Sequence, residues 1–163
     1  MKKTKEAFWT LIAELTEDNS VLDELLKKNR LMTEKMQKIQ PDEFEYTALG
    51  YTIHNIYNLM ENYFLRIAKF FENNIEGSSW HKDLLERMCL DIPTIRPALL
   101  TKENAKAIGE LRSFRHVFRN IYQSELDKEK IEKLNLSIPH TIQKFKISSD
   151  LFIEKLKQIV HNI

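Results

Sequence analysis

Apolar residues recur every three or four positions along almost the whole chain, a spacing typical of amphipathic helices. The clearest case is the segment over residues 42–73, which carries one unbroken apolar stripe: Leu49, Ile53, Ile56, Met60, Tyr63, Ile67 and Phe70. Only 3 glycines and 4 prolines occur among 163 residues, too few for the many turns of a β-sandwich or barrel. The pattern predicts an all-α protein.

The segment before this stripe predicts a second long helix. Residues 5–39 keep a heptad of apolar positions, and its register survives the polar residues 18–20, which favours one long helix. A break at this point, with Ser20 capping a separate helix, is the alternative. Asp42 then begins the next helix after a short link. Two long helices joined by a short link are expected to pack antiparallel, as at the start of an up-down bundle.

The middle of the chain predicts a short helix followed by a central one. Ser79 is expected to cap a short helix over residues 80–89. The link over residues 90–100 contains two prolines and should be extended or irregular there. Thr101 is expected to cap a central helix over residues 103–122.

The last third predicts two more helices. A short helix is expected over residues 128–134, with Asp127 as its cap, and a final helix over residues 138–159, with Pro139 in its first turn. Four main helices and two short ones would then form an up-down antiparallel bundle. At 163 residues the chain suits a single domain, residues 1–163, with a substantial core.

The helix expected over residues 103–122 has two unlike faces. Its apolar face carries Leu111, Phe114, Val117, Phe118 and Ile121, and its polar face carries Arg112, Arg115, His116, Arg119 and Asn120. Like charges at i,i+4 spacing repel by roughly 0.2–0.5 kcal/mol per pair, so the cluster points to an anionic ligand. Phosphate is the leading candidate, because the planar guanidinium matches phosphate oxygens. The alternatives are a plain solvated surface, or arginines paired with a buried acid such as Glu61.

A polar stripe also runs along the helix expected over residues 42–73. Its members, at i, i+3, i+4 and i+7, are His54, Tyr57, Asn58 and Glu61. We expect this stripe to point towards the arginine-bearing helix or a subunit interface. A hydrogen-bonded structural network is the alternative interpretation.

Several kinds of chemistry are excluded by what the chain lacks. It has no glycine-rich nucleotide-binding loop and no HExxH pair, and its five histidines are scattered, so we expect no metal and no cofactor. A formal net charge of +1 gives no global basic field, so any contact with nucleic acid must be local. Arginine beside histidine suits RNA cleavage without a metal, since a base takes the 2′-hydroxyl proton while cations stabilise the phosphorane. His116 is the only histidine within the basic cluster.

The cellular compartment is predicted from the cysteine content and the absence of apolar runs. A lone cysteine, Cys89, excludes an intrachain disulfide and suits a reducing environment. The N-terminal segment lacks a long apolar region, and no run approaches the length of a transmembrane span. We therefore expect a soluble cytoplasmic protein without membrane association.

The basic helix also carries a family resemblance. The segment RHVFRNIY at 115–122 resembles the R-x4-6-H-x-Y signature of HEPN domains, and specifically that of the HepT toxins of HepT/minimal-nucleotidyltransferase toxin–antitoxin systems. Other segments fit in the right order: ALGYTIHNIYNLMENYFLRIA at 48–68, SSWHKDLLERM at 78–88, IRPALL at 95–100 and ELRSFRHVFRNIY at 110–122. Together they span most of residues 45–125, which is far more specific than the short motif alone.

The resemblance implies an HEPN-like helical bundle that forms a homodimer. The motif helices would face each other across a cleft, and the activity would be that of a metal-independent endoribonuclease. Arg115 matches the motif arginine, His116 the polar residue that often follows it, and Tyr122 the terminal tyrosine. In such systems the nucleotidyltransferase antitoxin adenylylates that tyrosine, which adds negative charge where an RNA phosphate must bind.

The chain departs from the family pattern at Asn120, which stands where the catalytic histidine is expected. Asparagine can orient a phosphate or a 2′-hydroxyl, but it cannot exchange a proton near neutral pH. Either His116, about 40° around the helix from Asn120, has taken over proton transfer, or the nuclease is weak or inactive. The first hypothesis is a HepT-like ribonuclease toxin, with Arg115, His116 and Asn120 in catalysis and Arg112 and Arg119 binding RNA phosphates. The alternatives are an inactive HEPN module that partners a nucleotidyltransferase, and a helical scaffold without a ligand.

Overall fold

The computed structural model describes residues 3–72, 80–121 and 125–163. Within these ranges the chain forms five helices and no strand beyond one isolated bridge between Ile92 and Arg96. The helices are α1 (Lys5–Met36), α2 (Glu43–Glu72), α3 (Trp80–Met88), α4 (Lys102–Arg119) and α5 (Lys128–Asn162). The all-α prediction is therefore confirmed.

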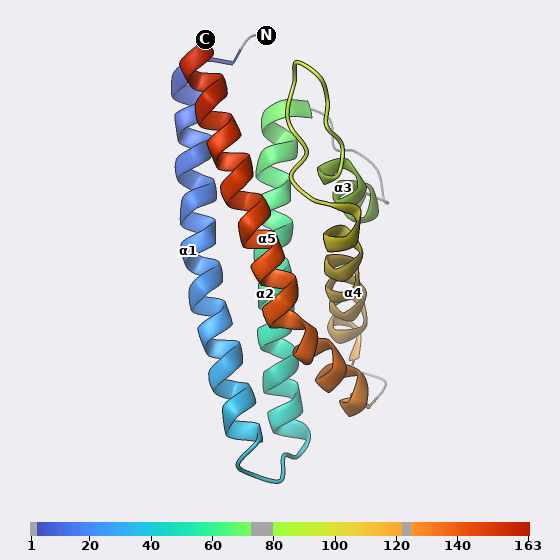
Figure 1. Ribbon diagram of the computed structural model, residues 1–163. Coiled ribbons are helices and arrows are strands. Elements are labelled where there is room, and N and C mark those ends of the chain that lie inside the picture. The colour runs from blue at the N-terminus through green and yellow to red at the C-terminus, as the bar shows by residue number, and fades with distance from the viewer. Residues whose placement is uncertain (1–2, 73–79, 122–124) are drawn as a thin grey trace.

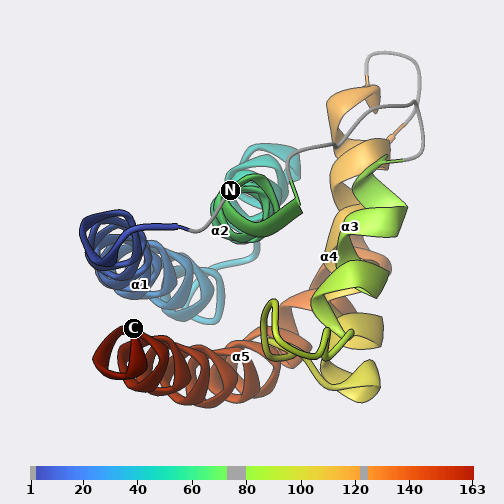
Figure 2. The same ribbon diagram turned by 90° about the horizontal axis from the view of Figure 1, so that it is seen from above.

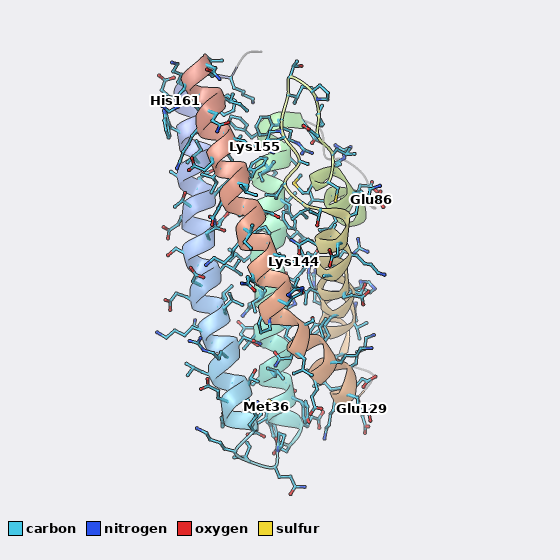
Figure 3. The ribbon with its side chains drawn as sticks, viewed as in Figure 1. Met36, Glu86, Glu129, Lys144, Lys155 and His161 are labelled. Carbon is cyan, nitrogen blue, oxygen red and sulfur yellow. The ribbon has the colours of Figure 1, made fainter. Side chains whose placement is uncertain are left out.

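Successive long helices run in alternating directions, as expected for an up-down bundle (Figure 1). Helix α2 is central, because it contacts all four other helices. Seen from above, α1 lies on one side of α2, and α3 and α4 lie on the other, while α5 runs from beside α1 across to α4 (Figure 2). His161 marks the end of the bundle where α1 begins, and Met36 marks the opposite end (Figure 3).

Helix α1 is continuous, so the prediction of one long helix is confirmed and the alternative of a break at Ser20 is wrong. Its polar interruption faces the neighbouring helices. Asp18 accepts an ion-paired hydrogen bond from Arg66 Nε on α2 at 2.8 Å, and Asn19 Nδ2 donates to Ser149 Oγ on α5 at 2.8 Å. These polar residues therefore form hydrogen bonds to the neighbouring helices and do not end α1.

Two of the expected helix caps are present. Asp127 Oδ1 accepts a hydrogen bond from the backbone N–H of Lys130 at 3.0 Å at the start of α5. Thr101 Oγ1 accepts one from the backbone of Asn104 at 3.1 Å at the start of α4. Each cap satisfies a backbone N–H that has no partner inside the helix. Ser79, the cap expected for α3, lies outside the described residues.

Helix α5 corrects the prediction of two separate helices over residues 128–134 and 138–159. It is one helix with Pro139 in its interior, so the described residues hold one short helix, α3, where two were expected. An interior proline loses a hydrogen bond to the carbonyl four residues earlier and costs about 3 kcal/mol. Buried residues lie on both sides of Pro139, so tertiary packing outweighs this cost. The first turns of α5 lean away from the axis of the rest (Figure 1).

A buried hydrogen-bond network sets the register of α1, α2 and α5. Asn29 Nδ2 lies 2.8 Å from both Thr52 Oγ1 and Asn135 Oδ1, and Asn135 Nδ2 donates to Thr33 Oγ1 at 2.9 Å. Sliding one helix along another would leave these buried amides without partners, which is costly. None of the described helices has an apolar stretch long enough to cross a membrane.

The link between α3 and α4 is irregular, as its two prolines predict, and it is organised by a buried arginine. The side chain of Arg96 is 0% exposed and donates to Glu72 Oε1, at the end of α2, at 2.7 and 3.0 Å. It also donates to the backbone carbonyl of Arg87 at 2.6 Å and to that of Leu90 at 3.1 Å. Arg87 reaches the same carboxylate, with Nη1 2.5 Å from Glu72 Oε2. This cluster joins α2, α3 and the link that leads into α4.

Candidate functional site

The polar stripe of α2 faces the basic side of α4, which is one of the placements expected for it. Both carboxylate oxygens of Glu61 on α2 accept hydrogen bonds from Arg115 Nη1 on α4, each at 2.6 Å. The Tyr57 hydroxyl donates to Glu61 Oε2 at 3.1 Å, and the Arg115 guanidinium lies 5.5 Å from the centre of the Tyr57 ring. The side chains of Arg115 and Glu61 are only 12% and 8% exposed, so the ion pair is largely removed from water.

This pairing fixes the orientation of Arg115. Nη1 makes both bonds to Glu61, whereas Nε and Nη2 donate to no acceptor among the residues that the structure describes. These nitrogens leave one edge of the guanidinium for a further anion. Burial, followed by the negative charge of Glu61 and the hydrogen bond to it, raises the pKa of Tyr57 well above its usual value. Tyr57 therefore remains a neutral donor beside the ion pair at physiological pH.

His54 lies earlier on the same stripe of α2. Its ring packs against Phe118 of α4, with 5.7 Å between the ring centres. Its Nε2 lies 2.8 Å from Asn58 Nδ2, and its buried Nδ1 has no hydrogen-bond partner within the described part of the chain. Burial lowers the pKa of His54, and the charges of Arg115 and Arg119 lower it further. The imidazole is therefore neutral at pH 7.

The close approach of α4 to this part of α2 depends on Gly50. A Cβ added at Gly50 would lie 2.7 Å from Phe118 Cε2 and 3.3 Å from Phe114 Cζ. The first distance is too short for any side chain without displacement of the phenylalanine ring. Glycine therefore allows Phe118 to reach the surface of α2 one turn before His54.

The other two arginines flank the Glu61–Arg115 pair. Arg112 is half-buried, and its charge opposes the rise in the pKa of Tyr57. Arg119 is exposed near the end of α4, and its charge acts on His54. Both predicted phosphate-binding residues therefore lie close enough to influence the groups of α2 electrostatically.

Two further predicted site residues, His116 and Asn120, do not join this cluster. His116 is exposed, and adjacent helical positions point about 100° apart, so it is directed away from the Glu61–Arg115 pair. Asn120 is the C-cap of α4 and is exposed, and its Nδ2 donates to the backbone carbonyl of His116 at 2.9 Å. Tyr122 lies outside the described residues.

The assembled groups are suited to a phosphodiester. A neutral imidazole and three guanidiniums lie along the α2–α4 contact, and one guanidinium is oriented by a carboxylate. Cations of this kind stabilise charge that develops on phosphate. Within the described ranges, no three His, Cys, Asp or Glu side chains gather as a metal site requires. The basic cluster itself suggested His116. Among the histidine side chains that the structure describes, His54 packs against Phe118 of α4, and the spacing of the α2 stripe was the available signal.

Comparison with known proteins agrees with this architecture. Residues 48–156 match a family described as HepT-like protein, and the match spans the α2–α4 contact and most of α5. No curated protein and no solved structure gives a significant match. The family match takes in 109 of the 163 residues, counting from 48 to 156. The chain therefore belongs to the family of HepT-like proteins.

Proposed function

We propose that this protein is a metal-independent endoribonuclease that acts as the toxin of a toxin–antitoxin system. The observation that carries the proposal is the state of Arg115. Glu61 holds one nitrogen of its guanidinium, and the others donate to no acceptor in the described parts of the chain. A pre-oriented cation stabilises the charge that develops on phosphorus in the transition state, and arginine does so through two parallel hydrogen bonds.

The proposed reaction is a transesterification within the RNA strand. A base removes the proton of a 2′-hydroxyl, the O2′–P bond forms and the P–O5′ bond breaks. The departing 5′ oxygen takes up a proton, which leaves a 2′,3′-cyclic phosphate and a 5′-hydroxyl. Arg112, Arg115 and Arg119 would neutralise the charge on the pentavalent phosphorus, so the step needs no metal ion.

The active form in this proposal is a homodimer. One bundle supplies one set of three arginines, and two α4 helices facing each other would double the positive charge around the scissile phosphate. Val117 on α4 is 51% exposed and offers an apolar contact beside the basic residues. Light scattering at micromolar concentration should give twice the 19.4 kDa of the chain, and a monomer would count against this arrangement.

The proposed partner is a minimal nucleotidyltransferase antitoxin that adenylylates Tyr122 in the cytoplasm. The transferred nucleotide would bring a phosphate to the basic helix and exclude RNA from it. Incubation of the two proteins with ATP should add one AMP to the peptide that contains Tyr122. The same mass change in a Tyr122→Phe variant would show that the modified residue is a different one.

The test of ribonuclease activity compares three proteins on total RNA in EDTA: the wild type, Arg115→Lys and a matched control, Arg30→Lys, at an exposed position of α1. Lysine keeps the positive charge opposite Glu61 but removes the planar fork. We expect Arg115→Lys to slow cleavage by about 100-fold and Arg30→Lys to leave it unchanged. Equal rates for all three would refute the role of Arg115. Arg115→Ala is a poorer choice, because it removes the whole guanidinium from a largely buried ion pair and would also lower stability.

A second candidate function is a catalytically inactive HEPN module that positions substrate for a nucleotidyltransferase. The placement of Asn120 favours this second function. Asn120 occupies the motif position at which the catalytic histidine is expected, and its side chain hydrogen-bonds to its own helix. This function predicts a tight complex with the nucleotidyltransferase and no RNA cleavage by the wild type at any concentration. RNA cleavage that is lost in Arg115→Lys would exclude it.

A further inference from the structure

The motif leaves the proposed reaction without a residue for proton transfer, since Asn120 has no titratable side chain. We propose that His54, on α2, is the general base of this site. This inference rests on the ribonuclease function proposed above and names the group that would take the 2′-hydroxyl proton. It places that group on a different helix from the motif.

The position of His54 distinguishes it from the other histidines. His116, His140 and His161 are exposed, whereas His54 is half-buried; the side chain of His81 lies outside the described residues. The ring of His54 packs 5.7 Å from that of Phe118, on the helix that carries the basic cluster. His54 is therefore the described histidine that the fold holds against the arginine-bearing helix.

Packing alone does not explain a histidine at this position. The Nδ1 atom of His54 is buried and has no hydrogen-bond partner in the described part of the structure, which is unfavourable for any polar atom. A leucine or phenylalanine could pack against Phe118 without leaving a polar atom unpaired. An unpaired buried polar group in a native structure calls for an explanation, and a catalytic role is one such explanation.

The hydrogen bond at the other nitrogen shows how a ribose could bind. Asn58 Nδ2 lies 2.8 Å from His54 Nε2, so the amide N–H donates to an unprotonated nitrogen. A ribose 2′-hydroxyl is also a donor and could take the place of this amide without changing the tautomer of the ring. Asn58 would then be free to hydrogen-bond the same ribose or its phosphate.

The charges around His54 keep it in the form that a base requires. Burial makes the largest contribution to lowering the pKa of His54. The two charged groups that face it from α4, Arg115 and Arg119, lower this pKa further. A neutral imidazole at pH 7 can accept a proton directly. The same two arginines would bind the scissile phosphate, so base and phosphate-binding groups lie side by side.

The proposed cleavage step needs no reactant other than RNA and water. His54 Nε2 takes the proton of the 2′-hydroxyl as the O2′–P bond forms and the P–O5′ bond breaks. The leaving 5′ oxygen takes a proton from water, and His54 afterwards returns its proton to the solvent.

The experiment measures kcat/KM in EDTA on a fluorescent RNA oligonucleotide of mixed sequence. The variants are His54→Gln, His116→Gln and the control His140→Gln, on the exposed side of α5. We expect His54→Gln to lower kcat/KM by about 100-fold or more and the other two to change it less than about twofold. In His54→Ala, added imidazole should restore part of the activity, and circular dichroism shows whether each variant is folded.

A second measurement uses the wild type and is independent of how the variants fold. The pKa of His54, followed by NMR of its ring carbon, should fall below the usual 6.5 and agree with the acid limb of kcat/KM. Disagreement between the two values would overturn the assignment, as would a large loss in His116→Gln with none in His54→Gln. If the wild type leaves RNA intact, the proposed function itself fails. If cleavage depends on Arg115 but not on His54, only this inference fails.

Discussion

The ion pair between Glu61 and Arg115 joins the two helices that build the site, and the strength of this interaction can be measured. Arg115 Nη1 lies 2.6 Å from both carboxylate oxygens, and the two side chains are 12% and 8% exposed. With about 4 Å between charge centres and an effective dielectric constant of about 20, the attraction is roughly 4 kcal/mol. Desolvation of the two ions offsets much of it, so the pair stabilises little in total but is costly to break.

A double-mutant cycle separates these effects. We expect Glu61→Gln and Arg115→Gln each to lower the free energy of unfolding by about 3 kcal/mol, because each removes one charge of a largely buried ion pair. In the double variant two neutral amides face each other, and we expect a total loss of about 3–4 kcal/mol, which corresponds to a coupling energy of about 2–3 kcal/mol. Urea unfolding at pH 7, followed by circular dichroism, gives all four values.

The matched control is Arg30→Gln, which removes an exposed arginine on α1 and should change stability by no more than about 0.5 kcal/mol. Strictly additive losses in the cycle, about 6 kcal/mol in the double variant, would refute the reasoning. Additivity would mean that the two charges do not interact in the folded protein and that Glu61 does not orient Arg115.

Two glycines and one buried arginine give further predictions. Gly50→Ala should lower stability by about 1–2 kcal/mol, because the new Cβ would lie 2.7 Å from Phe118 Cε2 and overpacking exceeds the gain in helix propensity. Gly109→Ala should raise stability by about 0.5–1 kcal/mol, because its nearest neighbour would be 4.0 Å away. Arg96→Met should lower it by about 3–5 kcal/mol, since Glu72 loses a buried partner. Burial pushes the pKa of Glu72 up, but its arginine partners hold it below the usual 4.5. The stability from this carboxylate is therefore complete above pH 4.5 and lost as the pH falls through its folded pKa, and this acid-induced loss should be smaller in Arg96→Met.

Urea titrations at several pH values measure all of these changes, and each has an internal comparison. Equal effects of Gly50→Ala and Gly109→Ala would contradict the close contact with α4. Arg30→Met serves as the exposed counterpart of Arg96→Met, and similar losses in the two would contradict a structural role for the buried guanidinium. An identical acid response in the wild type and Arg96→Met would show that Arg96 does not hold Glu72 ionised.

Hydrophobic spacing alone predicts most of the fold. It predicts α1 and α2 to within a few residues of their observed ends, because each helix buries one continuous stripe and that stripe is visible in the order of the residues. The caps Thr101 and Asp127 are also local features, since each acts on a backbone group three residues away. The continuous helix through Pro139 was not predictable in this way, because long-range burial there outweighs a local helix-breaking signal.

Buried charged side chains cannot be predicted from hydrophobic spacing. That spacing predicts that charged side chains lie in solvent, as most of them do. Arg96 is fully enclosed because Glu72, 24 residues earlier, and several backbone carbonyls reach it from α2, α3 and the link. Only the folded chain brings these groups together.

The site, like the fold, combines features that are visible in the sequence with contacts that form only on folding. The polar stripe of α2 and the basic face of α4 can be predicted from the order of the residues, since residues three and four apart share one side of a helix. The sequence also carries the segments that mark the HepT-like family. The pairing of Glu61 with Arg115 and the packing of His54 against α4 appear only in the folded chain, where His116, on α4 itself, is exposed. Periodicity shows which residues share a face of one helix, whereas packing between helices, such as the close contact of Gly50 with Phe118, sets how closely two faces meet.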